Sequence, residues 1–276
     1  MAIDVKAAVR ALRLFETFTA EGRPLTMTEL ATRLDIPPSS CLLLIRTFLR
    51  RGYLYETTVR GNYYPTRRML EQVSQIAARD PVVEFFRAPL MALRDRTEET
   101  VTLAKRQGDR AVYLAIFDSP QVVKPTVLVG TLRPLYSTAV GKALLGGMDE
   151  APRKELLARL EIKRITGRTI TSRPALEAEL AKSADRGWYS NDGETIDDLG
   201  GVAMPVRLAD DVLAVSVIAP TYRLKPLLKK HVLALARTCS QMQYEFVSTR
   251  SPVSSTRRGA RSRRMAGSAN MNGPQR

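Results

Sequence analysis

Two short amphipathic segments joined by a tight turn constrain the fold of this chain more than any other feature. The first segment, LTMTELATRLDI at 25–36, has Thr26 followed three residues later by Glu29, which is a capping-box pattern at the start of a helix. The second segment, 37–51, opens on two prolines, and proline at 37 or 38 fits the first turn of a helix. Two short helices separated by so tight a turn predict a helix-turn-helix.

The middle of the second helix, CLLLI at 41–45, is unusually apolar. At about 100° per residue, Cys41, Leu44, Ile45 and Phe48 share one arc of the helix and predict a core stripe. Leu43 falls on the other side; it could touch a thymine methyl, pack against a neighbouring subunit, or do neither. Residues expected on the outer face or its flanks are Ser39, Ser40, Leu42, Leu43, Arg46, Thr47 and Arg50.

A helix should precede this pair and a hairpin should follow it. In the segment 5–22, Val5, Val9, Leu12 and Phe15 stand at helical spacing. After the helix pair, YLYE and NYYP alternate as two strands about a turn that contains Arg60. These strands predict the wing of a winged helix-turn-helix, with Arg60 placed to contact a phosphate or a minor groove; the alternative is an ordinary exposed arginine of a loop.

The stretch 5–70 resembles the DNA-binding domain of the IclR family (isocitrate-lyase-regulator type transcription factors). The resemblance is carried by ALRLFETF, by LTMTELATRLDIPPSSCLLLIRTFLRRGYL and by GNYYPTRRML. Pro38 stands where a basic residue is usual in the family, and Leu42-Leu43 where a polar or basic pair is usual. The resemblance implies double-stranded DNA as a partner, with candidate contacts from Thr28, Ser39, Ser40, Leu43, Arg46, Thr47, Arg50 and Arg60.

Charge and composition narrow the class of protein. The net charge is +15, from 43 Lys and Arg against 28 Asp and Glu, which favours a polyanionic partner such as nucleic acid or an anionic membrane. The Arg-, Ser- and Gly-rich stretch 248–276 predicts a disordered basic tail, which could add phosphate affinity or have no role. Two distant cysteines and one histidine argue against a disulfide framework and a His-rich metal site. Without an apolar span or signal core, a cytoplasmic location is expected.

The rest of the chain alternates hairpins with helices. TVTLAKRQGDRAVYLAIF at 100–117 and GGVAMPVRLADDVLAVSVIAP at 200–220 each read as two strands about a turn, and helical stretches lie between them. This order predicts an α+β domain whose antiparallel sheet is covered by helices. The expected divisions are a winged helix-turn-helix domain at 1–66, a linker helix at 67–80, a second domain at 81–247 and the tail.

The second domain resembles the effector-binding domain of the same family, so the likeness covers nearly all of 5–245. Its markers are TEETVTLA, VGTLRPLYSTAVGKALLGG, RTITSRPALEAELAKSADRGWYSNDGE, GGVAMPV and LAVSVIAP. The resemblance implies a GAF-like sensor fold that binds a small organic acid. Since Gly201, Ile218 and Tyr136 replace residues that are usual in the family, an aromatic or bulkier acid is expected.

The local sequence also suggests how such an acid could bind. Ser137 or Thr138 can cap a helix whose first free amides belong to Ala139 and Val140, and a helix amino terminus attracts a carboxylate. An ordinary cap before a packed helix is the alternative. Candidate effector-binding residues are Ser137, Thr138, Ala139, Val140, Gly141, Asn191, Asp192, Gly201, Ser216 and Ile218.

Other classes of protein fit less well. YSTAVGKA departs from a phosphate-binding loop, since Tyr136 stands in place of glycine and Ala143 follows the lysine, and His231 lies in a Lys-rich helix unsuited to a catalytic base. We therefore expect no enzyme, no cofactor and no metal. The expected function is a DNA-binding transcriptional regulator, a homodimer or a dimer of dimers, modulated by a small acid. The alternative is a DNA-binding structural protein or regulator without an effector.

Overall fold

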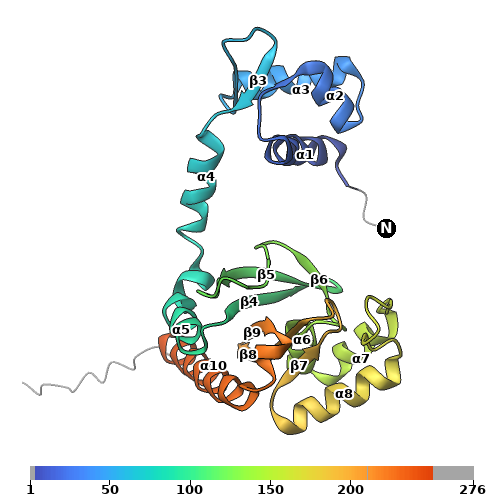
Figure 1. Ribbon diagram of the computed structural model, residues 1–276, viewed down its shortest axis with the longest axis vertical. Coiled ribbons are helices and arrows are strands. Elements are labelled where there is room, and N and C mark those ends of the chain that lie inside the picture. The colour runs from blue at the N-terminus through green and yellow to red at the C-terminus, as the bar shows by residue number, and fades with distance from the viewer. Residues whose placement is uncertain (1–3, 210, 251–276) are drawn as a thin grey trace, which may run out of the picture. The chain divides into compact units, whose positions relative to one another are not determined.

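The computed structural model describes residues 4–209 and 211–250, coloured along the chain in Figure 1. The chain divides between Ala88 and Pro89, within helix α5 (Pro81–Thr97), into two compact units. The tail expected at 248–276 lies outside the described residues from 251 on. The domain boundaries expected at 66, 80 and 247 remain predictions.

The first unit is a winged helix-turn-helix. Three strands form a small antiparallel sheet in the order β1-β3-β2, and the wing is the β2–β3 hairpin, in which Tyr55 pairs with Tyr64. The elements are α1 (Lys6–Glu21), β1 (Leu25–Thr26), α2 (Met27–Leu34), α3 (Pro38–Arg50), β2 (Leu54–Glu56), β3 (Asn62–Pro65) and α4 (Arg68–Ala77). The short strand β1 has too few residues to show an alternating pattern in the sequence.

Local sequence signals set the helix ends of this unit. The capping box at α2 is confirmed: the Thr26 hydroxyl accepts a hydrogen bond from the Glu29 amide, and the Glu29 carboxylate accepts one from the Thr26 amide at 2.8 Å. Helix α3 begins at Pro38, where the missing N–H has no partner to lose. The predicted stripe of α3 is confirmed as core, since Cys41 and Ile45 are fully buried and Leu44 and Phe48 pack against them.

The inward face of α1 differs from the apolar spacing that stood out in the sequence. Val5 and Leu12 are 70% and 66% exposed, whereas Leu14 and Phe18 fill the core. Phe15 is half-buried and packs edge-on against Phe48. Helix α1 therefore carries two apolar stripes, and the periodicity of one stripe alone cannot tell which of them is covered.

The second unit is an α+β fold, as expected. All strand pairs of its six-stranded sheet are antiparallel, in the order β6-β5-β4-β9-β8-β7. The strands are β4 (Thr100–Gln107), β5 (Arg110–Phe117), β6 (Leu132–Pro134), β7 (Tyr189–Asp192), β8 (Leu199–Leu208) and β9 (Asp211–Pro220). The helices after α5 are α6 (Ala139–Gly147), α7 (Glu150–Arg159), α8 (Arg173–Arg186), α9 (Thr221–Leu224) and α10 (Leu228–Arg250).

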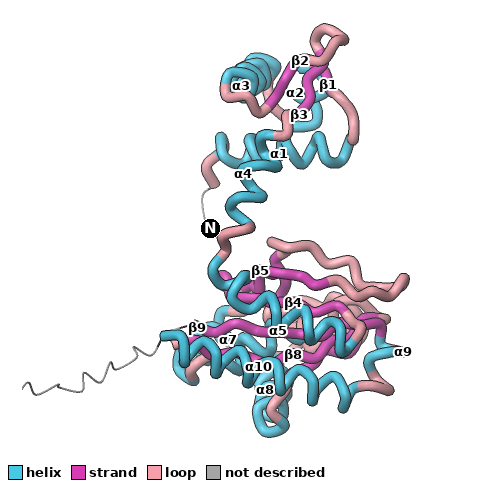
Figure 2. Tube along the Cα trace, turned by 90° about the vertical axis from the view of Figure 1, so that its left-hand side faces the viewer, coloured by secondary structure: helices cyan, strands magenta, loops and turns pink. Residues whose placement is uncertain are grey.

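Both faces of this sheet are covered. Ala203 and Ala214 share a buried cluster with Val140 and Leu144 of α6. Because successive strand residues point to opposite faces, the buried Val202, Val215 and Val217 belong to the other face. Helix α10 contacts β8 and β9, and α5 and α10 run across one side of the sheet in Figure 2. No helix within the described residues is long and apolar enough to cross a membrane.

The first turn of α6 lies very close to the segment before it. A side chain added at Gly141 would place its Cβ 2.4 Å from the backbone oxygen of Leu135 and 2.5 Å from its Cα. Only a glycine permits this approach. A second glycine, Gly167, lies in a loop and has nothing within 4 Å of its hypothetical Cβ, nor does it require a positive φ.

We predict that Gly141→Ala destabilises the second unit by about 1–3 kcal/mol or more, because the clashing atoms are backbone and α6 must shift. Gly167→Ala is the matched control and should change stability by less than about 0.5 kcal/mol. Thermal or urea unfolding measures both. Equal stabilities of the two variants would contradict the close packing of α6.

Candidate functional site

Helix α3 presents a polar face to solvent. Ser39, Arg46, Thr47 and Arg50 are exposed, in contrast to the fully buried Cys41 and Ile45 of the same helix. Within the described residues, neither Arg46 nor Arg50 forms an ion pair or a side-chain hydrogen bond. Their guanidinium groups are therefore available to an external partner such as a phosphate or a base edge.

The other candidate residues around α3 are placed less uniformly. Leu43 is 64% exposed, so the helix shows solvent a leucine between its polar residues, and the Thr47 hydroxyl donates to the Leu43 carbonyl at 2.8 Å. Ser40 is half-buried, and Thr28 on α2 is exposed. The apolar run 41–45 thus belongs mostly to the core, and Leu43 is its one fully outward member.

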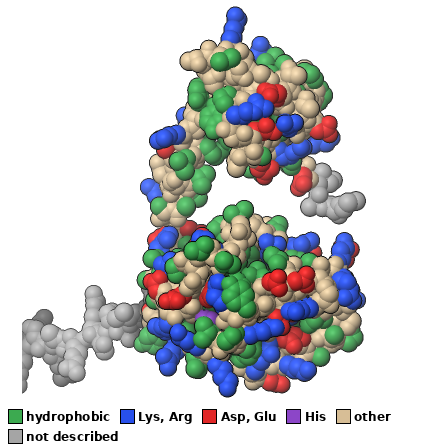
Figure 3. Space-filling model, in the orientation of Figure 1, with side chains coloured by type: hydrophobic (Ala, Val, Ile, Leu, Met, Phe, Trp, Pro, Cys, Tyr) green, Lys and Arg blue, Asp and Glu red, His purple; other side chains and the backbone are tan. Residues whose placement is uncertain are grey.

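The wing carries a further exposed basic residue, Arg60. Arg60 is exposed in the turn between β2 and β3, and it has no ion pair within the part of the chain that the structure describes. The turn is shaped by Gly61, which has a φ of 81° and donates its amide to the Glu56 carboxylate at 2.7 Å. A left-handed residue at this point favours glycine and sets the direction of the arginine before it. Figure 3 shows Lys and Arg side chains on the surfaces of both units.

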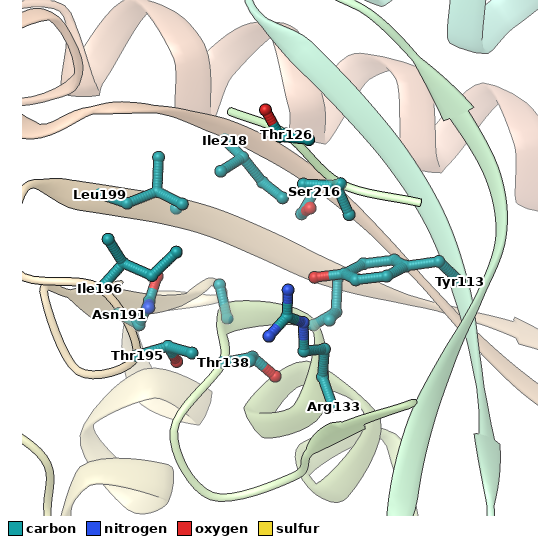
Figure 4. A pocket seen from close by; sticks show the side chains of 14 residues that line it. Tyr113, Thr126, Arg133, Thr138, Asn191, Thr195, Ile196, Leu199, Ser216 and Ile218 are labelled. Carbon is teal, nitrogen blue, oxygen red and sulfur yellow. The ribbon is translucent and has the colours of Figure 1, made fainter. Parts of the chain in front are cut away.

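The second unit holds a narrow pocket between its sheet and the amino end of α6 (Figure 4). The cavity volume is about 510 Å³, part of it open to solvent. A cavity of this volume can hold a small organic molecule. Its walls are Tyr113, Thr126, Val127, Arg133, Thr138, Ala139, Val140, Asn191, Thr195, Ile196, Leu199, Gly201, Ser216 and Ile218.

Most of the effector-binding residues expected from the sequence surround this one pocket. Those that line it are Thr138, Ala139, Val140, Asn191, Gly201, Ser216 and Ile218. Ser137 is buried behind the wall, where its carbonyl accepts from Asn191 at 3.2 Å and from Thr195 at 2.9 Å. Gly141 allows the helix to pack, and Asp192 points to the surface, where it pairs with Lys225 at 2.8 Å.

The amino end of α6 supplies backbone donors to the pocket. Thr138, rather than Ser137, is the cap: its hydroxyl accepts from the Gly141 amide at 3.1 Å and donates to the Pro134 carbonyl at 2.9 Å. The amides of Ala139 and Val140, in the first turn, have no carbonyl partner within the helix. A helix amino terminus with free amides favours an anionic group.

Several pocket residues could not be found from local sequence patterns. Tyr113 and Arg133 come from β5 and β6, and the remaining ones come from loops or the start of β8: Thr126, Val127, Thr195, Ile196 and Leu199. Arg133 reaches the pocket because β6 pairs with β5, where it stands opposite Ala111. Strand pairing of this kind is not visible in a stretch as short as 132–134, although a lone arginine between apolar residues is a weak signal.

A buried ion pair holds the loop that forms one wall. Lys142 of α6 is 1% exposed, and its Nζ contacts the Glu194 carboxylate at 2.5 Å and the Ser190 carbonyl at 3.1 Å. Burial raises the pKa of Glu194, and the ammonium group of Lys142 opposes that shift. The next residues along the chain, Thr195 and Ile196, line the pocket, so this pair fixes the position of a pocket wall.

A strap of chain, residues 118–131, forms the wall that carries Thr126 and Val127. Its first part is tied to the end of α5: the Ser119 hydroxyl donates to the Glu98 carbonyl at 2.6 Å. Arg223 of α9 binds the Glu99 carboxylate through two nitrogens, at 2.7 and 2.9 Å, and also donates to the Val123 carbonyl at 2.8 Å. Glu99 is buried, so this ion pair is shielded from solvent and differs from an exposed surface pair.

Comparison with known proteins agrees with both parts of this geometry. The family model for the IclR helix-turn-helix domain matches residues 7–57, and the one for the bacterial transcriptional regulator IclR C-terminal matches residues 74–243. The chain belongs to the IclR family. It is a DNA-binding transcriptional regulator of that family, with α3 in the helix-turn-helix and the pocket in the C-terminal domain.

Relatives of this IclR-family regulator match most of its length. It is 28% identical over 234 residues to the transcriptional regulator KdgR of Escherichia coli (strain K12), and this alignment covers 83% of this chain and 89% of KdgR. The crystal structure of Thermotoga maritima IclR has the same fold, with a TM-score of 0.76 at 22% identity over 87% of this chain and 98% of that one. An IclR homologue from Microbacterium hydrocarbonoxydans, complexed with 4-hydroxybenzoate, aligns with a TM-score of 0.71 at 20% identity over 88% of this chain and 99% of that one.

We predict that Arg46→Ala and Arg50→Ala each weaken binding to a duplex selected by the wild-type regulator, by about 1–3 kcal/mol where the arginine contacts a base. An arginine that contacts a phosphate should instead lower the slope of log affinity against log salt by about one. Fluorescence anisotropy at several salt concentrations measures both quantities. Arg96→Ala, an exposed arginine of α5, removes the same charge and should leave the affinity nearly unchanged.

We also predict that Lys142→Met destabilises the C-terminal unit by about 3–5 kcal/mol, because it leaves the Glu194 carboxylate buried without its cation. Burial raises the folded-state pKa of Glu194, so the loss should be larger at pH 8 than at pH 5, where the group is protonated more readily. Lys154→Met breaks an exposed pair with Glu150 and should change stability by less than about 0.5 kcal/mol. Chemical unfolding at both pH values tests this, and a pH-independent loss would contradict it.

Proposed function

We propose that this regulator binds its operator through α3 and the wing, and that a small organic acid bound in the C-terminal pocket changes the operator affinity. The observation that carries the proposal is the pocket itself, where free amides at the start of α6 and one guanidinium face a cavity with aliphatic walls. Such a surface favours a carboxylate attached to an apolar body. The relative complexed with 4-hydroxybenzoate supports an aromatic acid as the first class to test.

Binding rather than turnover is the proposed chemistry of the pocket. The one histidine, His231, is fully buried in α10 and is not among the residues that line the pocket. Burial lowers the pKa of His231, so its neutral form is favoured. The pocket walls supply hydrogen-bond donors and acceptors, one cation and aliphatic side chains, which together recognise a ligand.

A homodimer or dimer of dimers would place two α3 helices in successive major grooves, about 34 Å apart. An exposed apolar surface on the first unit supports self-association. On α4, Leu70, Val73 and Ile76 are 64%, 51% and 72% exposed, and Leu12 of α1 is 66% exposed. Apolar residues at such spacing on an exposed helix face are typical of a surface that a partner covers. The acid would act by binding better to one arrangement of the two DNA-binding units than to another.

The direct test is a thermal-shift screen of the full chain against a library of carboxylic acids that includes 4-hydroxybenzoate. A ligand at 100 times its Kd should stabilise the regulator by about 2.7 kcal/mol. A stabilising acid should then change operator affinity by roughly 5- to 150-fold. A screen in which no acid stabilises the protein would favour the alternative, a DNA-binding regulator without an effector.

Filling the pocket should separate ligand response from DNA binding. Ser216 is fully buried on the pocket floor, where its hydroxyl is 2.7 Å from that of Thr102. We predict that Ser216→Leu abolishes acid-induced stabilisation and leaves operator affinity unchanged, because the added side chain occupies the narrow cavity. Ser216→Ala removes the same hydrogen bond without filling the pocket and should keep the response. Loss of operator binding in the leucine variant would indicate misfolding and not a blocked site.

A further inference from the structure

Arg133 is a cation inside the pocket without a counter-charge. It is half-buried, and it forms no ion pair or side-chain hydrogen bond within the described residues. None of the residues that line the pocket is acidic. A half-buried guanidinium gains most from an anion that offers two oxygens in its plane, and a carboxylate has that shape.

The Tyr113 hydroxyl lies beside this cation. Tyr113 and Ala111 are two residues apart on β5, so they face the same side of the sheet, and Ala111 is the register partner of Arg133. In Figure 4 the guanidinium and the phenol are directed into the same part of the pocket. Burial raises the pKa of Tyr113, although nearby Arg133 lowers it, so the hydroxyl keeps its proton and can donate to an anion.

The other end of the pocket is aliphatic. Ile218 of β9 forms the floor there, and Ile196 and Leu199 appear with it on the side away from Arg133 (Figure 4). The pocket therefore has a charged end and an apolar end.

We propose that Arg133 is the charge anchor of the effector and selects a monocarboxylic acid with an elongated aromatic body. The carboxylate lies between Arg133, Tyr113 and the start of α6, and the body extends to Ile196, Leu199 and Ile218. This inference rests on the proposed function, and it adds the class and the orientation of the ligand.

Two neighbouring classes of acid fit less well. An acid of two or three carbons can satisfy Arg133 but leaves the aliphatic end uncovered, so it gains little from burial of apolar surface. A dicarboxylate long enough to fill the pocket puts its second charge beside Ile196, Leu199 and Ile218, where the lining residues offer no second cation. Partial burial of that charge costs free energy, although Ile196 is 50% exposed and leaves the charge some contact with water. Gly201 also lines the pocket, where a Cβ would lie 3.2 Å from the Asn191 amide oxygen and 3.4 Å from the Ala139 Cβ, so a side chain at this position would crowd the pocket wall.

The experiment compares four acids, namely benzoate, phenylacetate, 3-phenylpropionate and cinnamate, with their uncharged primary amides, with acetate and with adipate. Calorimetry and thermal shift on the full chain give the affinities. We expect an aromatic acid to bind the wild type at least about 10-fold more tightly than its amide, acetate or adipate. Arg133→Met should weaken that acid by about 10- to 150-fold and leave its amide unchanged, which is the range for a hydrogen bond to a charged group. Arg133→Lys should restore part of the loss.

Arg110→Met is the matched control, since Arg110 is exposed on β5 next to β6 and does not line the pocket. It should leave the affinity for the acid unchanged, and unfolding temperatures of the arginine variants show whether they are folded. Equal binding of the acid to wild type and Arg133→Met overturns the anchor but leaves the proposed function standing. Failure of all four acids to bind the wild type overturns the ligand class, and the wider acid screen then decides the proposed function separately.

Discussion

The first turn of α6 can lie against the backbone of Leu135 only because residue 141 has no side chain. The amides of Ala139 and Val140 in this turn lie at the pocket, and the Thr138 hydroxyl accepts from the amide of Gly141 itself. One turn later Lys142 reaches the Glu194 carboxylate and holds the loop on the other side of the pocket. A shift of α6 by the width of a methyl group would therefore change the cap, the donors and the far wall together.

In the DNA-binding unit, the two faces of α3 have different tasks. Helix α3 must fill a small core with Cys41 and Ile45 and still leave Arg46 and Arg50 outside. The apolar run 41–45 contains more apolar residues than the one buried stripe of α3. Leu43 lies outside that stripe and is 64% exposed among polar neighbours. Its position is compatible with apolar contact to a thymine methyl, and a single exposed leucine is also ordinary on a protein surface.

Features set by neighbouring residues could be predicted from the sequence. The capping box at Thr26, the proline start of α3 and the hairpins of the sheet depend on contacts within a few residues, and all of them are found. The covered face of α1 could not be predicted, because two apolar stripes compete and only the packing of Leu14 and Phe18 decides between them.

In the candidate pocket, too, some residues could be predicted from local motifs and others depend on long-range strand pairing. Thr138, Asn191, Gly201, Ser216 and Ile218 stand in motifs that resemble the family and lie around one cavity. Arg133 and Tyr113 depend on the pairing of β5 with β6, a long-range arrangement that no local pattern encodes. Asp192 stands next to Asn191 but points to solvent, because neighbouring residues of a strand face opposite sides. Sequence resemblance therefore found the region, and strand geometry decided which side chains enter it.

The strap over the pocket has two attachments of different kinds. Through Thr126 and Val127 it touches the space that a ligand would fill. Its Ser119 hydroxyl donates to the Glu98 carbonyl, where α5 gives way to β4, and its Val123 carbonyl accepts from Arg223, which also binds the Glu99 carboxylate. Glu98 has a φ of 58°, an uncommon conformation for a residue with a side chain, so the junction is already under backbone strain. A ligand that displaced the strap would therefore also act on that junction. Because linkage is reciprocal, a change at the junction would then alter the affinity for the ligand by the same factor.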